Sequence, residues 1–326
     1  MVQTRVKTFA AVMAGFAFLF FAALANAAKT TEKKIETDNM EIISERADVD
    51  MESEEFTIPG AVEIKIGDIR IKGKNLTFSN KTMIAELSGN PLTATLGTEI
   101  QAEAGKIFLD INKEQATLSG GCRFTQTRAG GRVEFESETI DTNYGEKGWA
   151  RSRGEVKIHY RKIEGKDKQK AETDGAAKKP VIDTDEVFGT AGTVYYTFDD
   201  RQLEASHTVR IEIKEGAFTA AELKGNLEKE KLALSGGIQG KIKDVSFSAA
   251  RMDIDYKAQE TDIWGGVDVT RDSGDHFKAD HVWLRYKEGA RALKTSGGVQ
   301  MNLKVDKEKL RKKIENEKPA PEGGKP

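Results

Sequence analysis

Residues 247–256 read FSAARMDIDY, and residues 277–286 read FKADHVWLRY. Both stretches follow one pattern: a large apolar residue, a small residue two positions later, and then, three positions further on, apolar residues at alternate positions. Copies of this pattern, some weaker than others, begin at eight positions: Ile35, Ile71, Ile100, Phe135, Gly189, Phe218, Phe247 and Phe277. A repeat about 30 residues long predicts a stacked array of similar units, which builds one long groove rather than one pocket.

The apolar residues in each repeat alternate with polar ones. Val62, Ile64 and Ile66 have a period of two, and the same period recurs at 209–213. Alternation of this kind predicts strands with one buried face. Helical spacing occurs only in residues 306–317, so the sequence predicts an all-β fold of antiparallel strands, followed by a short helix.

The pattern contains a phase break, because three positions rather than two separate the small residue from the next apolar residue. In a strand that keeps one face inward, such a break predicts a bulge or corner. Glycine pairs such as 120–121 and 265–266 favour the same conclusion, because glycine tolerates positive φ. The copy SHTVRIEI at 206–213 lacks this glycine.

Stacking of the repeats would place the small residues in one column, where two sheets can approach closely. We predict that this column is the narrow seam of an elongated, V-shaped and twisted β-jelly roll. The predicted seam residues are Gly73, Ala102, Ala191, Ala220, Ala249 and Ala279, with Thr37 and Ser137 in weaker copies.

The apolar positions beyond the seam would line the wider part of the wedge. We predict that ten of them face inward: Leu76, Phe78, Ile107, Leu109, Val194, Tyr196, Met252, Ile254, Val282 and Leu284. Two interpretations remain open at this point. The residues either line a groove for an apolar ligand or fill a dry core.

The first 27 residues have the layout of a secretory signal peptide, with basic Arg5 and Lys7, an apolar stretch at 9–24 and small residues up to Ala27. We predict cleavage after Ala27. The apolar stretch is short for a membrane span, which needs about 20 residues, and an uncleaved inner-membrane anchor is the alternative.

Four further segments follow. Residues 28–160 and 184–304 are predicted to form two jelly-roll lobes of four repeats each. Residues 161–183 form a charged insert between them, and residues 305–326 form a short helix and a disordered tail. Whether the lobes share one continuous groove stays open.

Three pairs of motifs resemble the OstA-like (LptA–LptC) family of lipopolysaccharide transport proteins. The motifs are KADHVWLRY with SGGVQMNL, SAARMDIDY with WGGVDVT, and IKGKNLTFS with PGAVEIKI; IETDNMEI resembles the first strand of the family. The resemblance covers residues 31–160 and 184–304, and this chain has about twice the usual number of repeats.

The resemblance implies a periplasmic transport protein that shelters the acyl chains of lipid A in an apolar groove. Its partners would be lipopolysaccharide and other jelly-roll transport proteins, joined by edge-strand addition at the inner-membrane transporter and the outer-membrane translocon. It implies neither enzymatic activity nor a cofactor. It leaves open whether this chain has the bridging or the membrane-proximal role.

Composition excludes several other classes. The net charge is −2, and basic residues gather at 161–180 and 305–326, so the body is acidic and unsuited to nucleic acid. The single cysteine, Cys122, allows no intrachain disulfide and is predicted to be buried and inert. The four histidines lack a ligand cluster, so no metal site is predicted. A structural or adhesive β-solenoid with a dry core, and a polysaccharide-acting enzyme, remain as alternative functions.

Overall fold

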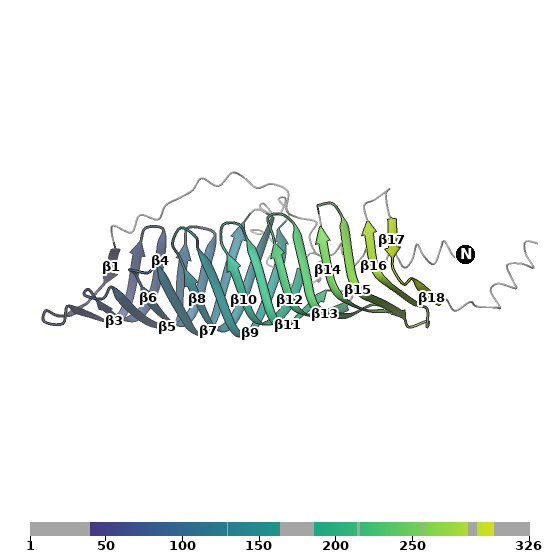
Figure 1. The fold of residues 1–326 in the computed structure, drawn as a ribbon. Helices are drawn as coiled ribbons and strands as arrows, with labels where there is room; N and C mark the ends of the chain where they lie inside the picture. Colours follow the sequence, from purple (N-terminus) through teal and green to yellow (C-terminus); the bar gives the residue numbers. More distant parts are fainter. Residues whose placement is uncertain are drawn as a thin grey trace, which may run out of the picture.

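The computed structural model describes residues 40–128, 130–163, 186–213, 216–255, 257–285 and 292–302. Within these ranges the chain forms eighteen β-strands and no helix (Figure 1). The predicted signal peptide, most of the charged insert and the predicted helix at 306–317 lie outside the described residues.

The strands follow one another along a single long axis (Figure 1). Their bounds are β1 (Met40–Ser44), β2 (Asp48–Asp50), β3 (Glu55–Ile66), β4 (Ile69–Ser79), β5 (Ile84–Leu96), β6 (Ile100–Asp110), β7 (Gln115–Arg128), β8 (Gly130–Asn143), β9 (Trp149–Ile163), β10 (Glu186–Thr197), β11 (Gln202–Ile213), β12 (Gly216–Asn226), β13 (Lys231–Ile242), β14 (Val245–Asp255), β15 (Glu260–Arg271), β16 (His276–Arg285), β17 (Ala292–Ser296) and β18 (Gln300–Asn302).

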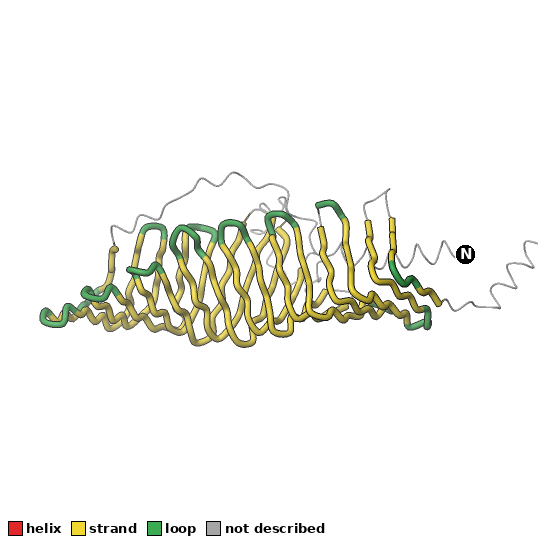
Figure 2. The backbone as a smooth tube through the Cα atoms, in the orientation of Figure 1, coloured by secondary structure: helices red, strands yellow, loops and turns green. Residues whose placement is uncertain are grey.

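Each strand from β3 to β15 pairs antiparallel with the next, and hairpin turns join most of these strands (Figure 2). The prediction of an all-β, antiparallel jelly roll is therefore confirmed. β9 pairs with β10 from Trp149↔Thr197 to Arg161↔Glu186. Backbone hydrogen bonding thus passes without interruption from the first predicted lobe to the second.

Bulges occur where the sequence analysis placed them. In the β13–β14 ladder, Ser235 pairs with Arg251 and Ile238 pairs with Ala249. Two residues of β13 therefore lie opposite one residue of β14, which is the arrangement of a β-bulge. The ladders β7–β8, β11–β12 and β15–β16 show the same two-against-one shift. The phase break, which is on β14, therefore lies opposite the extra residue of a bulge on β13.

The two bulged residues have positive φ. Gly236 and Gly237 have φ values of 82° and 85°, and Gly265 and Gly266 have values of 80° and 71°. In the copy that lacks glycine, His207 and Thr208 occupy the same place with φ values of 64° and 63°. A β-branched residue at positive φ is sterically strained, so the bulge geometry is retained there against the local preference of the side chain.

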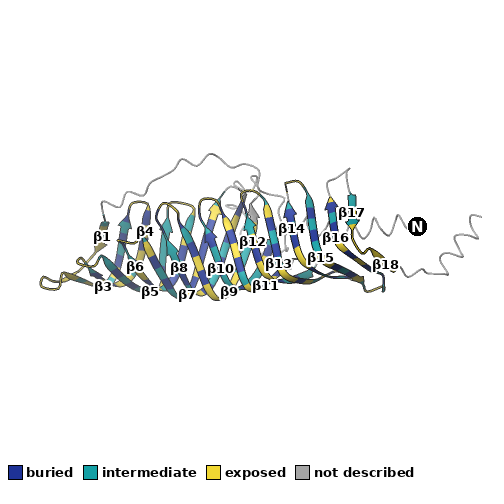
Figure 3. Ribbon diagram, in the orientation of Figure 1, coloured by how far each residue is buried: buried dark blue, intermediate teal, exposed yellow. Residues whose placement is uncertain are grey.

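The bulges allow the sheet to fold back on itself around an apolar interior. Phe124 of β7 packs against Tyr196 of β10 with ring centroids 6.4 Å apart, although β8 and β9 separate these two strands in the sheet. Buried and more exposed residues alternate along the long strands, apart from the bulges (Figure 3). One side of every long strand thus faces a shared core.

We predict that replacing Thr208 with glycine stabilises the protein. Left-handed backbone costs an L-residue about 1–2 kcal/mol, and glycine gives back part of that through its more flexible unfolded chain. The free energy of unfolding of Thr208→Gly, measured by urea denaturation, should therefore rise by up to about 1 kcal/mol.

Thr190, which pairs regularly with Arg210, provides the matched control. Thr190→Gly should lower the free energy of unfolding by roughly 0.5–1 kcal/mol. Equal destabilisation by both substitutions would show that the strain at Thr208 is absent.

Candidate functional site

The predicted inward residues all lie in the apolar interior. None of the ten exposes more than 3% of its surface. Leu76 and Phe78 are on β4, Met252 and Ile254 on β14, and their neighbours Thr77 and Asp253 are more exposed. These positions are therefore inward-facing, and a role in binding lipid stays a prediction.

Five of the six predicted seam residues are buried alanines on β6, β10, β12, β14 and β16. The sixth, Gly73 on β4, is half-buried. A Cβ atom built on Gly73 would lie 2.0 Å from Leu92 Cδ2, so a side chain there would displace Leu92. The close packing gives a physical reason for a small residue at Gly73. That the column forms a narrow seam stays a prediction.

An apolar cavity of about 70 Å³ lies in the first half of the interior. Ile107 and Leu109 of β6 line it together with Ala102, Phe124 and Phe198. This volume holds about two water molecules, whereas a fatty-acyl chain is several times larger. The interior around this cavity is therefore largely filled by protein side chains.

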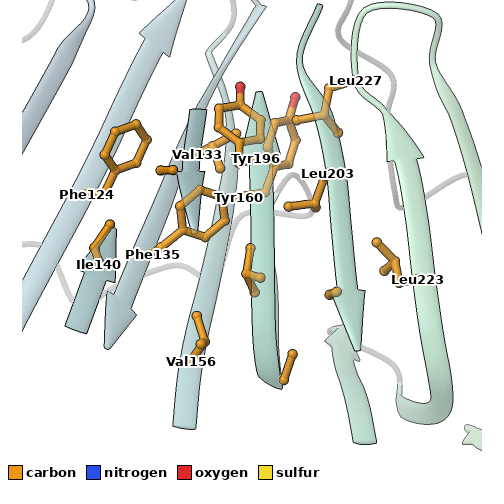
Figure 4. Close-up of a cluster of buried hydrophobic side chains, with 14 of the residues drawn as sticks. Phe124, Val133, Phe135, Ile140, Val156, Tyr160, Tyr196, Leu203, Leu223 and Leu227 are labelled. Carbon is orange, nitrogen blue, oxygen red and sulfur yellow. The ribbon is translucent and has the colours of Figure 1, made fainter. Parts of the chain in front are cut away.

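Four aromatic rings fill the middle of the interior, and we call them the aromatic cluster: Phe124, Phe135, Tyr196 and Phe198. Phe124 stacks on Phe135 and on Phe198 with centroid distances of 5.8 and 5.5 Å, and Phe135 lies 5.5 Å from Tyr196. Figure 4 shows Phe124, Phe135 and Tyr196 directed into the core between β7 and β10. Such ring pairs add about 0.5–1.5 kcal/mol each beyond the burial of their area.

Polar groups beside this cluster connect the C-terminal end of β7 with the end of β10 and the turn that follows it. We call these contacts the clasp. Tyr196 Oη donates to Gln126 Oε1, and Gln126 Nε2 donates to the Phe198 carbonyl over 3.4 Å. Arg128 Nη1 donates to the Asp199 carbonyl over 3.2 Å. Burial raises the pKa of the Tyr196 hydroxyl, which therefore remains a donor. The end of β7 is thus tied to the turn that follows β10.

Sequence reasoning missed Gln126, Arg128 and the buried Arg201 of the adjacent turn. A signal for Gln126 was present, because Cys122, Phe124 and Gln126 alternate and place a polar side chain on the apolar face. Gln126 is 0% exposed. No pattern indicated that the turn after β10 would place Arg201 in the interior.

Cys122 is buried at 2% exposure, as predicted, and its thiol donates to the Glu138 carbonyl. His276 and His281 each contact one carboxylate, of Asp268 and Asp262 respectively. No group of three residues suited to a metal ion occurs in the described part of the chain.

Comparison with known proteins identifies the first part of the chain. Residues 41–148 match the sequence model of the family "LptA/(LptD N-terminal domain) LPS transport protein". The matched stretch runs from β1 to the residue before β9. The family is one of transport proteins and not of enzymes, as the sequence analysis predicted, and the suspected OstA-like relationship is confirmed.

One solved structure similar to this chain is that of LptH from Pseudomonas aeruginosa, described as the LptA-homologous periplasmic component of the lipopolysaccharide transport device. It is 16% identical, covers 32% of this chain and 76% of its own, and gives a TM-score of 0.29. No curated protein matches the sequence significantly. Within the described ranges, no helix is long and apolar enough to cross a membrane.

We predict that Cys122 does not react with a thiol-alkylating reagent in the folded protein at pH 8. Burial raises the pKa of its thiol to about 11, so almost none is present as the reactive thiolate at that pH. Because Cys122 is the only cysteine, mass spectrometry of the whole protein gives an unambiguous readout. Labelling should become complete in urea, and rapid labelling without urea would contradict the packed interior.

Proposed function

We propose that the protein is a periplasmic lipopolysaccharide-binding transport protein that shelters lipid A acyl chains in its interior. The observation that carries this proposal is the continuous apolar face that runs from β3 to β16, combined with the family match over residues 41–148. Exposure of each acyl CH₂ group to water costs about 0.8 kcal/mol. An apolar path along the whole molecule removes that cost during transfer.

Loading would require the layers to separate on the side of the clasp. Each long strand continues through its corner from one layer of the folded sheet into the other. The layers could therefore part on the opposite side without breaking the hydrogen bonds between strands. At the clasp, by contrast, the layers are held by the contacts of Gln126, Arg128 and Tyr196. Acyl chains would replace the apolar side chains that face one another in the closed state, which keeps both surfaces out of water.

The end strands support a role as a bridge. β1 and β2 pair with β3 at one end, and β17 and β18 pair with β16 at the other. All residues of β2 and β18 are exposed. Open edges of this kind promote strand addition. We therefore propose that jelly-roll proteins at the inner-membrane transporter and the outer-membrane translocon pair with these ends.

A structural β-array with a dry core is the second candidate, and the tight packing of the interior favours it. The apolar cavity beside Phe124 and Phe198, of about 70 Å³, is too small for a lipid. The two candidates differ in whether the layers can part, which a chemical probe inside the core can decide.

We predict that a photo-crosslinking amino acid at Leu76 or Ile254 forms adducts with lipopolysaccharide in cells. Both side chains are almost completely buried in the interior. The same probe at Thr77 or Asp253, the outward neighbours, should give no adduct. Adducts are detected by immunoblotting after irradiation.

Equal labelling at all four positions would contradict a sheltered binding site in the interior. No labelling at any position, with the variants folded as judged by circular dichroism, would favour the dry core.

A further inference from the structure

Six described residues occupy equivalent positions in turns, and Arg201 is the one among them whose side chain is buried. The residue just before each of β3, β5, β7, β11, β13 and β15 has positive φ, and these residues are Glu54, Met83, Glu114, Arg201, Glu230 and Gln259. Five of them are exposed or half-buried, whereas Arg201 is only 5% exposed. The turn geometry is therefore shared, and the burial of a cation belongs to this turn alone.

The Arg201 guanidinium has few hydrogen-bond partners among the described residues. Its Nε donates to Tyr196 Oη over 3.4 Å, and its buried Nη2 has no hydrogen-bond partner among the described residues. No carboxylate of the described residues forms an ion pair with it. The neighbouring Asp200 carboxylate instead accepts hydrogen bonds from Thr197 Oγ1 and Gln202 Nε2. A buried charge without a counter-charge is costly, so the site is suited to an anion from outside.

A second buried donor without a partner among the described residues lies in the adjacent turn. The Tyr144 hydroxyl is buried without a partner, and Tyr144 lines the same apolar cavity as Phe198. The turn that holds Tyr144 is next to the turn that holds Arg201, because Phe198 N donates to Gly148 O over 2.9 Å. On the facing end of β7, Arg128 adds a second positive charge, which Glu99 partly offsets.

These donors stand at the clasp, where the apolar interior meets the turns. We propose that Arg201, assisted by the Tyr144 hydroxyl, binds a phosphate group of the transported amphiphile while its acyl chains occupy the interior. The proposal rests on the transport function above. Guanidinium groups bind phosphate through paired, charge-assisted hydrogen bonds, and the low-polarity surroundings strengthen such bonds.

Such an anchor would also couple headgroup recognition to opening. Gln126 and Arg201 both bind Tyr196 Oη, so an anion that draws Arg201 away changes the hydrogen bonding of the clasp. A phosphorylated amphiphile would thus loosen the contact that closes the layers at the point where it enters.

The test compares binding of lipid A that carries its two phosphates with binding of chemically dephosphorylated lipid A of the same acylation. The unmodified protein should bind the phosphorylated lipid about 10-fold more tightly, the effect of one charge-assisted hydrogen bond. Arg201→Met should remove most of this preference, because it weakens binding of the phosphorylated lipid more than binding of the dephosphorylated lipid. Tyr144→Phe should reduce the preference by a smaller factor.

Arg210→Met is the matched control, because Arg210 is an exposed arginine on β11 that pairs with Glu212, and it should leave the preference unchanged. Arg201→Met should unfold at the same or a higher urea concentration, since it removes an unpaired buried charge. Should that variant fail to fold, Arg201→Lys retains the charge but not the paired donors and should show an intermediate preference.

Equal affinity of the unmodified protein for the two lipids would overturn the phosphate site alone. An equal loss of both affinities in Arg201→Met would also overturn it, because Arg201 would then only support the fold. Failure of the unmodified protein to bind either lipid would overturn the transport function and this site with it.

Discussion

The structure depends on one geometric constraint: each long strand must turn a corner and still keep its apolar side chains on the inner face. Regular alternation cannot do this, because a bend that leaves the period at two would leave part of the strand facing the wrong way. The bulge solves the problem with one extra residue on one strand of each pair. Its requirement for positive φ explains the glycine pairs, and His207 and Thr208 show that the corner forms even where glycine is missing.

The same constraint explains why so much of the fold could be predicted from sequence. The alternation at 62–66 and the phase break after Ala249 are local signals; the first is confirmed as a strand, and the second lies opposite a bulge. The clasp could not be predicted in this way. Gln126 and Phe198 are far apart in sequence, and their contact depends on how the layers close. Nothing in the residues around Arg201 distinguishes an inward turn from the outward turns of the other repeats.

A packed interior is compatible with a transport function only if the free energy that holds the two layers together at the clasp is small. The buried aliphatic and aromatic side chains contribute the same favourable burial whether they contact one another or the acyl chains of a lipid. Exchange of one apolar contact for another therefore changes the free energy little. The stability of the closed arrangement then depends on the few polar contacts of the clasp. A hydrogen bond contributes only about 0.5–1.5 kcal/mol net. Closure and loading are states of similar free energy on this account.

The polar residues of the clasp are consequently the part of the interior where sequence change should matter most for function and least for stability. An all-apolar version of Gln126, Tyr196 and Arg201 would bury no unpaired donor and would close more firmly. The chain instead retains a buried guanidinium beside a buried amide and a phenol. On the proposal that a charged headgroup pairs with Arg201, the cost of burying its guanidinium without a counter-charge would be offset when the lipid is bound.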